Sequence, residues 1–508
     1  STSPPTWAWP ARVAADTFTG QGADDTFTGL ADYTDVTENS ASTFNVATDV
    51  LDGAGGYDTL ALTLSSSGVG PKLTLDPSKI RNIERLSVAS TATLAEVALT
   101  GTSFTELVSN RATSGMAFTG FGSSVTKLGV TGPSSGNVTF TPDGVALAGT
   151  ADAITLTLTD VGTSSQSPIV SLTPSGGVAT DFYETLNIVS SVATGAANYI
   201  RLAMGTNQTS LTRINISGSA PLSLNFPSND NARAVQTIDA SAATGALTIG
   251  STTATLGVAD QTVILGSGTN LVYFGANLDG NDTVDGSRGG NDTLAVIAST
   301  NTSPFNAGAF AHVTGVETLR VSGVTTLIQD FSVLPTSVTT LQFAQTSPFA
   351  YTLNKLASGM TVELLATPNN SATITLSLAN NSASDALTLK FNFPTTPTPG
   401  QHAERRGRPG DAEHRLHRRG DDQPHRPRQG HGQAGDHRQH RSDPEHVQRC
   451  RWQRRRRRVH RQCRALQAHD HRPNPQRRRQ HRAALQERHR HERHYGPGRR
   501  RQLFGLGV

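Results

Sequence analysis

A short pattern of apolar and polar residues recurs along the first 400 residues and limits the folds open to this chain. In each copy an apolar residue is followed by two polar residues and then by an apolar-any-apolar triplet. The closing triplet alternates with a period of two, which predicts a strand that buries one face. The copies begin at Ile83, Val125, Tyr183, Leu211, Val316 and Val338.

The spacing of the copies indicates how these strands are arranged. Leu86, Leu107 and Leu128 are equally spaced, and Leu319 and Leu341 are separated by nearly the same interval. One strand every ~20 to 25 residues, with Ser, Thr, Gly and Asn turns between strands, is typical of a parallel β-solenoid. Looser spacing elsewhere, as between Leu186 and Ile214, leaves an array of β-sandwiches open. We expect an all-β chain folded as a parallel β-solenoid with turns like those of a β-roll.

Composition divides the chain into two polypeptides of opposite charge. Up to Gly400 there are 14 Lys and Arg against 29 Asp and Glu, a formal charge of −15, with His312 as the one histidine and no cysteine. From Gln401 onward there are 30 Arg, no Lys, 11 Asp and Glu, 15 His and both cysteines, a formal charge of +19. Because the acidic part has no cysteine, stacking or bound metal ions must stabilise it in place of disulfides.

The basic tail has the composition of a gene read one base out of phase. Arg, His, Gln and Pro share codons that begin with C. With permitted codons read one base later, the tail segment 471–481 becomes Thr-Gly-Leu-Thr-Leu-Asn-Ala-Ala-Gly-Asn-Ile, which has the composition of the body. Our hypothesis is a frameshift between Phe393 and Glu404, which leaves residues 401–508 disordered. The alternative is a basic segment that binds polyanions, since clustered Arg neutralises phosphates.

Two related Gly/Asp-rich segments indicate that the body is duplicated. LDGAGGYDTLAL at 51–62 precedes the repeat at Ile83, and VDGSRGGNDTLAV at 284–296 precedes the repeat at Val316. The expected organisation is an N-terminal segment of uncertain structure at 1–15, a first β-repeat module at 16–275, a second at 276–400, and the tail at 401–508.

The Gly/Asp segments also predict metal binding. Aspartates recur with a period of nine at the N-terminus and of ten at 280–294. Glycine permits the positive φ of a tight turn, and an aspartate two residues before a buried apolar residue supplies a carboxylate. Stacked turns of this kind can cage Ca²⁺ with about six to eight oxygens. The candidate ligands are Asp16, Asp24, Asp25, Asp58, Asn281, Asp282, Asp285, Asn291 and Asp292.

These turns resemble the nonapeptide of the RTX calcium-binding β-roll. Together with the segment 80–88, which reads IRNIERLSV, they make the body similar to the β-strand-repeat surface-layer (S-layer) proteins of Gram-negative bacteria, over roughly Asp16 to Phe393. The resemblance implies a bacterial cell-surface location, type I secretion through an uncleaved C-terminal signal, and Ca²⁺-driven assembly over lipopolysaccharide. Ala23 stands where the nonapeptide has Gly, so we expect a few sites of modest affinity.

Three classes of function fit these features to different degrees. A structural surface-array protein is the first hypothesis, an RTX-type secreted adhesin the second, and a polysaccharide-modifying enzyme the third. Catalysis usually needs converging acid and base groups, and the body offers five Lys and His312 alone, so we expect no enzyme. The expected partners are further copies of the chain and lipopolysaccharide or a surface glycan, without nucleic acid. The sequence contains no run of ~20 apolar residues, so we predict no transmembrane segment.

Overall fold

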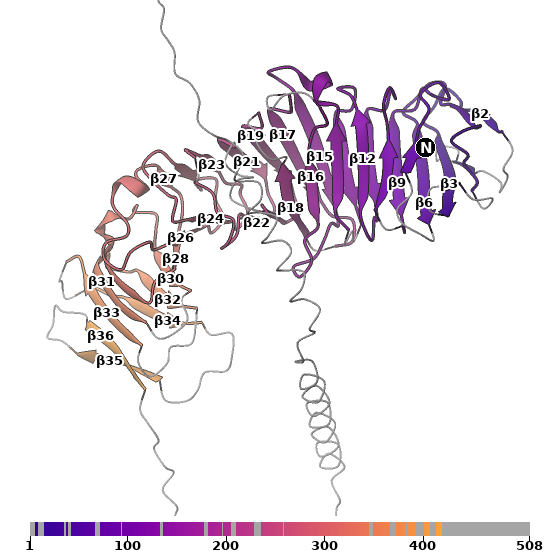
Figure 1. Ribbon diagram of the computed structural model, residues 1–508. Coiled ribbons are helices and arrows are strands. Elements are labelled where there is room, and N and C mark those ends of the chain that lie inside the picture. The colour runs from indigo at the N-terminus through magenta and orange to yellow at the C-terminus, as the bar shows by residue number, and fades with distance from the viewer. Residues whose placement is uncertain are drawn as a thin grey trace, which may run out of the picture. The chain divides into compact units, whose positions relative to one another are not determined.

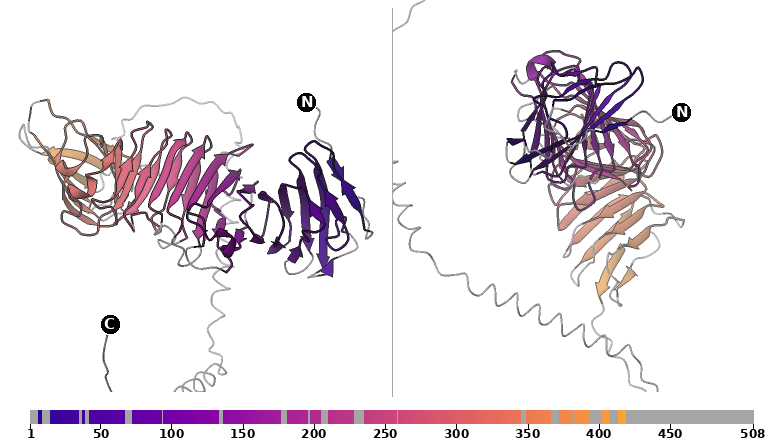
Figure 2. Two further views of the ribbon diagram at one scale, coloured as in Figure 1. Left: turned by 90° about the horizontal axis from the view of Figure 1, so that it is seen from above. Right: turned by 90° about the vertical axis from the view of Figure 1, so that its right-hand side faces the viewer.

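Two long parallel sheets run through most of the described chain in the computed structural model (Figure 1). Successive rungs, where a rung is one full turn of the chain, add neighbouring strands to each sheet (Figure 2). The result is a β-solenoid of about 12 turns, as the repeats predict. The described residues contain no α-helix.

The structure describes residues 6–8, 15–34, 37–38, 42–66, 72–92, 94–132, 136–176, 181–195, 197–204, 210–227, 235–257, 259–344, 349–365, 372–380, 382, 384–392, 401–406 and 413–418. Most of the uncertain N-terminal segment at 1–15 lies outside these ranges. The same holds for most of the tail expected to be disordered, of which two strands are described.

Sheet 1 consists, in spatial order, of β1 (Thr6–Ala8), β3 (Thr26–Thr34), β6 (Thr59–Ser66), β9 (Arg85–Ser90), β11 (Glu106–Asn110), β13 (Lys127–Thr131), β15 (Ala153–Thr159), β17 (Thr185–Ser191), β19 (Arg213–Gly218), β21 (Thr237–Ala243), β23 (Thr262–Ile264), β25 (Thr283–Asp285) and β27 (Val313–Thr314). A short strand, β4 (Thr37–Glu38), pairs antiparallel with β3.

Sheet 2 consists of β7 (Lys72–Thr74), β10 (Ala95–Ala98), β12 (Met116–Phe121), β14 (Val138–Pro142), β16 (Ile169–Leu172), β18 (Asn198–Met204), β20 (Leu222–Asn225), β22 (Leu247–Ile249), β24 (Leu271–Gly275), β26 (Thr293–Ile297), β28 (Thr318–Ser322), β30 (Thr340–Phe343), β32 (Thr361–Leu364) and β34 (Thr388–Phe391).

Shorter elements complete the rungs towards each end. Sheet 3 holds β2 (Thr17–Thr19), β5 (Val50–Asp52) and β8 (Ile80–Arg81), and sheet 4 holds β29 (Thr326–Asp330), β31 (Ala350–Leu356) and β33 (Thr373–Leu378). Among the described residues, 3₁₀ turns lie at Gly144–Leu147, Gly308–Phe310 and Phe331–Val333. In the tail, β35 (Gln401–Arg406) and β36 (Glu413–Arg418) pair antiparallel.

The core is built from apolar side chains that stack in register from rung to rung. Leu86 pairs with Leu107 and Leu107 with Leu128, so the equal spacing of these leucines in the sequence is one rung of sheet 1. Leu319 and Leu341 pair in the same way in sheet 2. All five leucines are buried. Because side chains alternate along a strand, every second residue points into the core. The apolar-any-apolar triplets of the repeats lie in the strands that supply these residues.

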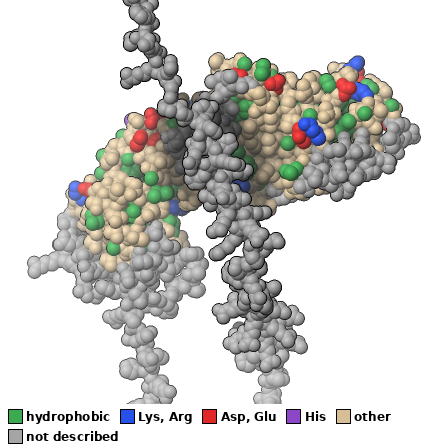
Figure 3. Space-filling model, in the orientation of Figure 1, with side chains coloured by type: hydrophobic (Ala, Val, Ile, Leu, Met, Phe, Trp, Pro, Cys, Tyr) green, Lys and Arg blue, Asp and Glu red, His purple; other side chains and the backbone are tan. Residues whose placement is uncertain are grey.

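Charged side chains are few on the face that Figure 3 shows, and the outward positions of the described strands are mostly Thr, Ser and Asn. Threonine suits strands because its branched Cβ packs well on a pleated surface. Neighbouring rungs also bond outside the core, as where the Asn215 amide donates to Asn187 Oδ1 at 2.8 Å. The short spacing of strands within a sheet thus links side chains that are far apart in sequence.

The two Gly/Asp turns connect different pairs of sheets. The turn at 53–58 joins β5 of sheet 3 to β6 of sheet 1, whereas the turn at 286–292 joins β25 of sheet 1 to β26 of sheet 2. Strand β24 ends at Gly275 and pairs with β26 beyond the expected module border. Strands of both expected modules are therefore part of one continuous stack, within a compact unit that spans residues 1–422.

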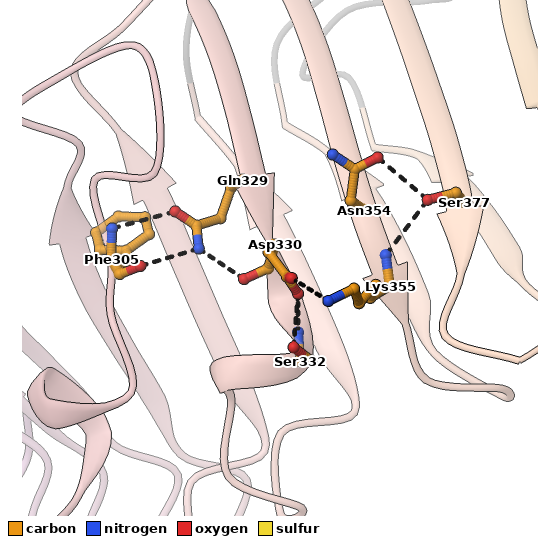
Figure 4. Close-up of polar contacts among 7 residues, drawn as sticks. All are labelled: Phe305, Gln329, Asp330, Ser332, Asn354, Lys355 and Ser377. Carbon is orange, nitrogen blue, oxygen red and sulfur yellow. Dashed lines mark hydrogen bonds and ion pairs between the residues drawn. The ribbon is translucent and has the colours of Figure 1, made fainter.

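A loop between β26 and β27 is held against β29 by a parallel backbone bridge between Thr302 and Ile328 and by a buried amide. The side chain of Gln329 accepts a hydrogen bond from the Phe305 backbone N–H at 3.1 Å and donates to the Phe305 carbonyl at 3.0 Å (Figure 4). The amide thus pairs with Phe305 as a neighbouring strand would. Nearby, Lys355 and Asp330 form an exposed ion pair at 2.7 Å.

Candidate metal centre at the glycine and aspartate turns

The aspartate that ends each Gly/Asp turn lies inside the solenoid. Asp25, Asp58, Asp282 and Asp292 are at most 1% exposed. Each stands two residues before a buried apolar residue, so the alternation of a strand places both side chains on the inner face. At these four positions the aspartate two residues before a buried apolar residue is thus itself buried.

These buried carboxylates accept backbone hydrogen bonds from the preceding rung. Oδ1 of Asp58 accepts from the Asp25 N–H at 2.7 Å, and Oδ1 of Asp292 accepts from the Asn270 N–H at 3.1 Å. A buried backbone N–H without an acceptor is costly. The aspartates thus satisfy donors at points where the chain turns and the ladder of the sheet has not yet begun.

A glutamate side chain in the following rung accepts a hydrogen bond from the backbone N–H of the aspartate. The backbone N–H of the aspartate donates to the glutamate Oε2 in three pairs, at 2.8, 2.7 and 2.6 Å: Asp58 to Glu84, Asp292 to Glu317, and Asp152 to Glu184. In all three pairs the glutamate belongs to the apolar-polar-polar-apolar repeat, and in the first two pairs the aspartate belongs to a Gly/Asp turn. The two recurring sequence motifs are therefore the two partners of one contact between rungs.

The remaining candidate ligands lie nearer the surface. Asp24, Asn281 and Asn291 are exposed, and Asp16 and Asp285 are partly exposed. Asp285 is already engaged, because it accepts from the Ser287 N–H at 3.0 Å. The nine candidates thus divide into buried carboxylates in the core and side chains on the outer turns.

The structure brings the N-terminal candidates together and separates those of the second cluster. Asp24 and Asp25 lie close enough to Asp58 to raise its pKa, as does Glu84. By contrast, Asp282 and Asp292 precede strands of different sheets, β25 in sheet 1 and β26 in sheet 2. The two GNDT units therefore do not form one site.

Three glycines leave room for oxygen atoms beside these carboxylates. A Cβ on Gly53 would lie 2.4 Å from Asp58 Oδ2 and 1.9 Å from the Asn82 carbonyl, and a Cβ on Gly286 would lie 2.6 Å from Asp292 Oδ2. A Cβ on Gly20 would meet Asp25 in the same way. Asp58 Oδ2 and Asp292 Oδ2 are buried without a hydrogen-bond partner in the protein. Each glycine thus faces a carboxylate oxygen.

Burial makes these carboxylates hard to ionise. Desolvation, with the Glu317 charge added, raises the pKa of Asp292 to about 6. Desolvation also raises the pKa of Asp58, to which the charges of Glu84 and Asp25 contribute. The pKa of Asp282 is raised by its burial and by the charges of Asp279 and Asp260. A buried negative charge is costly unless a cation or a proton neutralises it.

Calcium fits the chemistry of these turns in part. Asp58 Oδ2 and Asp292 Oδ2 are hard oxygen donors without a hydrogen-bond partner, and each lies near a backbone carbonyl of the next rung. Among the described residues, however, no three Asp, Glu, His or Cys side chains converge on one point. Backbone carbonyls and water would therefore have to complete the shell of about six to eight oxygens.

Several members of this network were not among the sequence-derived candidates. Glu84 and Glu317 follow Asp58 and Asp292 at similar distances in the sequence. Each of these separations is close to the length of one rung. This similarity could have predicted that the two residues of each pair are in contact. Asn270 gave no such signal, although its side chain accepts from the Leu247 N–H at 3.1 Å and continues the same column.

No protein-family model matches this chain, and no curated protein matches it.

The one histidine of the body, His312, is exposed in the turn before β27, where its carbonyl accepts from the Val284 N–H. No helix among the described residues is long and apolar enough to cross a membrane.

Proposed function

We propose that this chain is a structural protein of a bacterial cell surface, similar to S-layer proteins, that is secreted and self-associates in the presence of Ca²⁺. The observation that carries the proposal is the set of buried carboxylates in the Gly/Asp turns, among which Asp58 and Asp292 each keep an oxygen without a hydrogen-bond partner. Such buried carboxylates need a counter-charge when they are ionised. Ca²⁺ is abundant outside cells and prefers oxygen ligands.

A scaffold role suits the rest of the molecule. A solenoid distributes its stability over many similar rungs and presents long flat faces. The described outer face is rich in Thr, Ser and Asn with few charges (Figure 3), and such a face can lie against another copy without burying unpaired charge. The partners of this proposal are other copies of the chain, with lipopolysaccharide or a surface glycan beneath the array. The proposed location is extracellular, after type I secretion.

An RTX-type secreted adhesin is the second candidate, because it would share the acidic repeats and the calcium turns. An adhesin recognises a surface or a glycan, whereas an array protein recognises itself. No catalytic role is proposed: the buried carboxylates bond to backbone N–H groups, so they are not presented to a substrate.

Assembly on addition of calcium separates these candidates. The purified protein is dialysed from EGTA into millimolar Ca²⁺, with Mg²⁺ as a control, and followed by light scattering and negative-stain electron microscopy. The array proposal expects ordered sheets with Ca²⁺ alone. A protein that stays monomeric in Ca²⁺ but binds a glycan array would favour the adhesin, and no response to Ca²⁺ in either assay would contradict both.

A further inference from the structure

The last described rung leaves an edge of sheet 2 open. Strand β34 is the terminal strand of sheet 2 among the described residues. Leu389 of β34 pairs with Val362 of β32, which is fully buried, yet Leu389 itself is only partly buried. At the other end of the sheet, Leu73 of β7 is fully buried. The inner face is thus less covered at the β34 end than at the β7 end.

We propose that β34 is the docking edge for one further rung, and that this rung is the segment 409–415 read one base later in the coding DNA. The genetic code restricts what that reading gives. Each shifted codon consists of the last two bases of one codon and the first base of the next. The last two bases of the Asp411 codon and the first base of the Ala412 codon therefore encode Thr or Met. Ala412 yields Leu, Pro, Gln or Arg; Glu413 yields Asn or Ser; His414 yields Thr or Ile. These options include the sequence Thr-Leu-Asn-Ile.

Strand β17 already contains that sequence, at Thr185 to Ile188. The match extends on both sides. Gly410 read one base later can give Glu, and Arg415 can give Val. The shifted segment can therefore reproduce Glu184 to Val189 of the body, including the glutamate that caps the aspartate N–H of the preceding rung.

The position of the segment agrees with the length of a rung. In sheet 2, Leu319 pairs with Leu341 and Leu341 with Val362, so each of these intervals in the sequence is one rung. Ala412 follows Leu389 at nearly the same interval. A leucine at this position of the shifted reading would therefore pair with Leu389.

The neighbouring columns of sheet 2 agree with this register. One column contains threonine in five consecutive rungs: Thr293, Thr318, Thr340, Thr361 and Thr388. The next position in that column falls on the codon of Asp411, which the shifted reading restricts to Thr or Met. The outer polar column runs Arg320, Gln342, Glu363 and Lys390, and its next position becomes Asn or Ser. Three adjacent columns thus continue across the edge of β34.

An added rung would complete the edge of the sheet. In a parallel pair, successive residues direct their backbone groups to opposite neighbours. The Thr388 N–H donates to the Met360 carbonyl at 3.0 Å, on the β32 side, so the Leu389 N–H points toward the open edge. Unprotected edge strands invite pairing with other chains, and the further rung would occupy this edge.

The test compares two full-length proteins: the chain as printed, and the chain from the same gene with one base removed between codons 393 and 404. Sequencing must first show that the shifted frame stays open through codon 415 and encodes Thr-Leu-Asn-Ile or a variant that keeps its apolar alternation. Amide hydrogen exchange at Leu389 should then slow by about tenfold or more in the frame-restored protein, and its melting temperature should rise.

Protection of Thr388, whose N–H already bonds to β32, serves as the internal control and should change less. A stop codon before codon 415, or polar residues in place of the apolar pair, would overturn the proposal. Unchanged exchange at Leu389 after frame restoration would overturn it as well. So would concentration-dependent protection of Leu389 in the chain as printed, because the occupant would then be a second copy.

Discussion

The backbone N–H of Asp58 donates a hydrogen bond to Oε2 of Glu84 at 2.8 Å, although the two residues are far apart in sequence. The carbonyl of Asp58 accepts from the Glu84 N–H at 3.1 Å in return. The two residues therefore pair as members of adjacent rungs. The equivalent bond from Asp292 to Glu317 shows that the duplicated Gly/Asp turns reproduce one local structure at two places in the stack.

Removing the glutamate acceptor should destabilise the solenoid. In Glu84→Ala the buried N–H of Asp58 loses its partner, and an unsatisfied buried donor costs about 1–3 kcal/mol. Glu84→Gln keeps a side-chain oxygen and removes a negative charge beside Asp58, so its cost should be smaller. Urea unfolding of both variants provides the comparison. Equal losses in the two would show that charge, and not the hydrogen bond, governs the contribution of Glu84.

The glycines of one turn should differ sharply in their tolerance of a methyl group. A Cβ on Gly53 would lie 1.9 Å from the Asn82 carbonyl, whereas a Cβ on Gly55 would have only the Gly22 Cα near it, at 4.0 Å. Gly53→Ala should therefore lower stability by about 2 kcal/mol or more, because backbone must shift. Gly55→Ala should stay within about 0.5 kcal/mol. Thermal unfolding of this matched pair tests the close packing of the turn against the next rung.

The amide of Gln329 should control the order of the loop that it fastens. In Gln329→Glu the donor to the Phe305 carbonyl is lost and a buried carboxylate faces that oxygen (Figure 4). We expect faster proteolysis within 299–312 and little change in β6 or β9. Lys355→Gln removes only an exposed ion pair, which usually contributes less than about 1 kcal/mol. If Lys355→Gln increased proteolysis of the loop as much as Gln329→Glu does, the hydrogen bonds of the Gln329 amide would not be what orders the loop.

The contribution of Asp292 to the stability of the metal-free protein should fall as the pH rises from about 4 to above 6. The pKa of Asp292 is raised to about 6 from the ordinary 3.8, so the folded state holds a proton that the unfolded state has released. Stability from such a group is full below the unfolded pKa and declines through the folded one. The contribution is about 1–3 kcal/mol.

Asp292→Asn cannot ionise but keeps an oxygen for the Asn270 N–H, so it isolates this effect from the other carboxyl groups. Denaturant unfolding in calcium-free buffer at pH 5.0 and 7.5 should show a smaller difference for the variant than for the natural protein. A difference of the same size in both would mean that Asp292 ionises normally in the folded state.

The strand repeats were predictable because they depend on period-two alternation and on rung length. The equal spacing of Leu86, Leu107 and Leu128 gave the register of three neighbouring strands directly. The sheet switch between the two Gly/Asp turns was not predictable. Turns of similar sequence join sheet 3 to sheet 1 in one place and sheet 1 to sheet 2 in the other. The reason is that the number of strands in a rung depends on how the whole cross-section packs.

The candidate site was predictable in its residues more than in its contacts. The motif placed Asp58 and Asp292 beside the core, but it treated every Asp and Asn of a cluster as equivalent. Exposure separates them: Asn291 is exposed, and its neighbour Asp292 is completely buried. The partner of each buried carboxylate lies one rung away, at a distance in sequence that varies with loop length, so no local motif identifies it.

Calcium-dependent thermal unfolding tests the central claim most directly. At pH 7.5 the melting temperature should be higher in millimolar Ca²⁺ than in EGTA, because a cation that binds only the folded state adds about 2.7 kcal/mol per site at a hundredfold excess over Kd. Asp58→Asn combined with Asp292→Asn should abolish most of the difference. Asp282→Asn should retain it, because both oxygens of Asp282 already accept backbone hydrogen bonds. Identical melting curves in Ca²⁺ and EGTA would contradict the account and leave the buried carboxylates as metal-free caps of the solenoid.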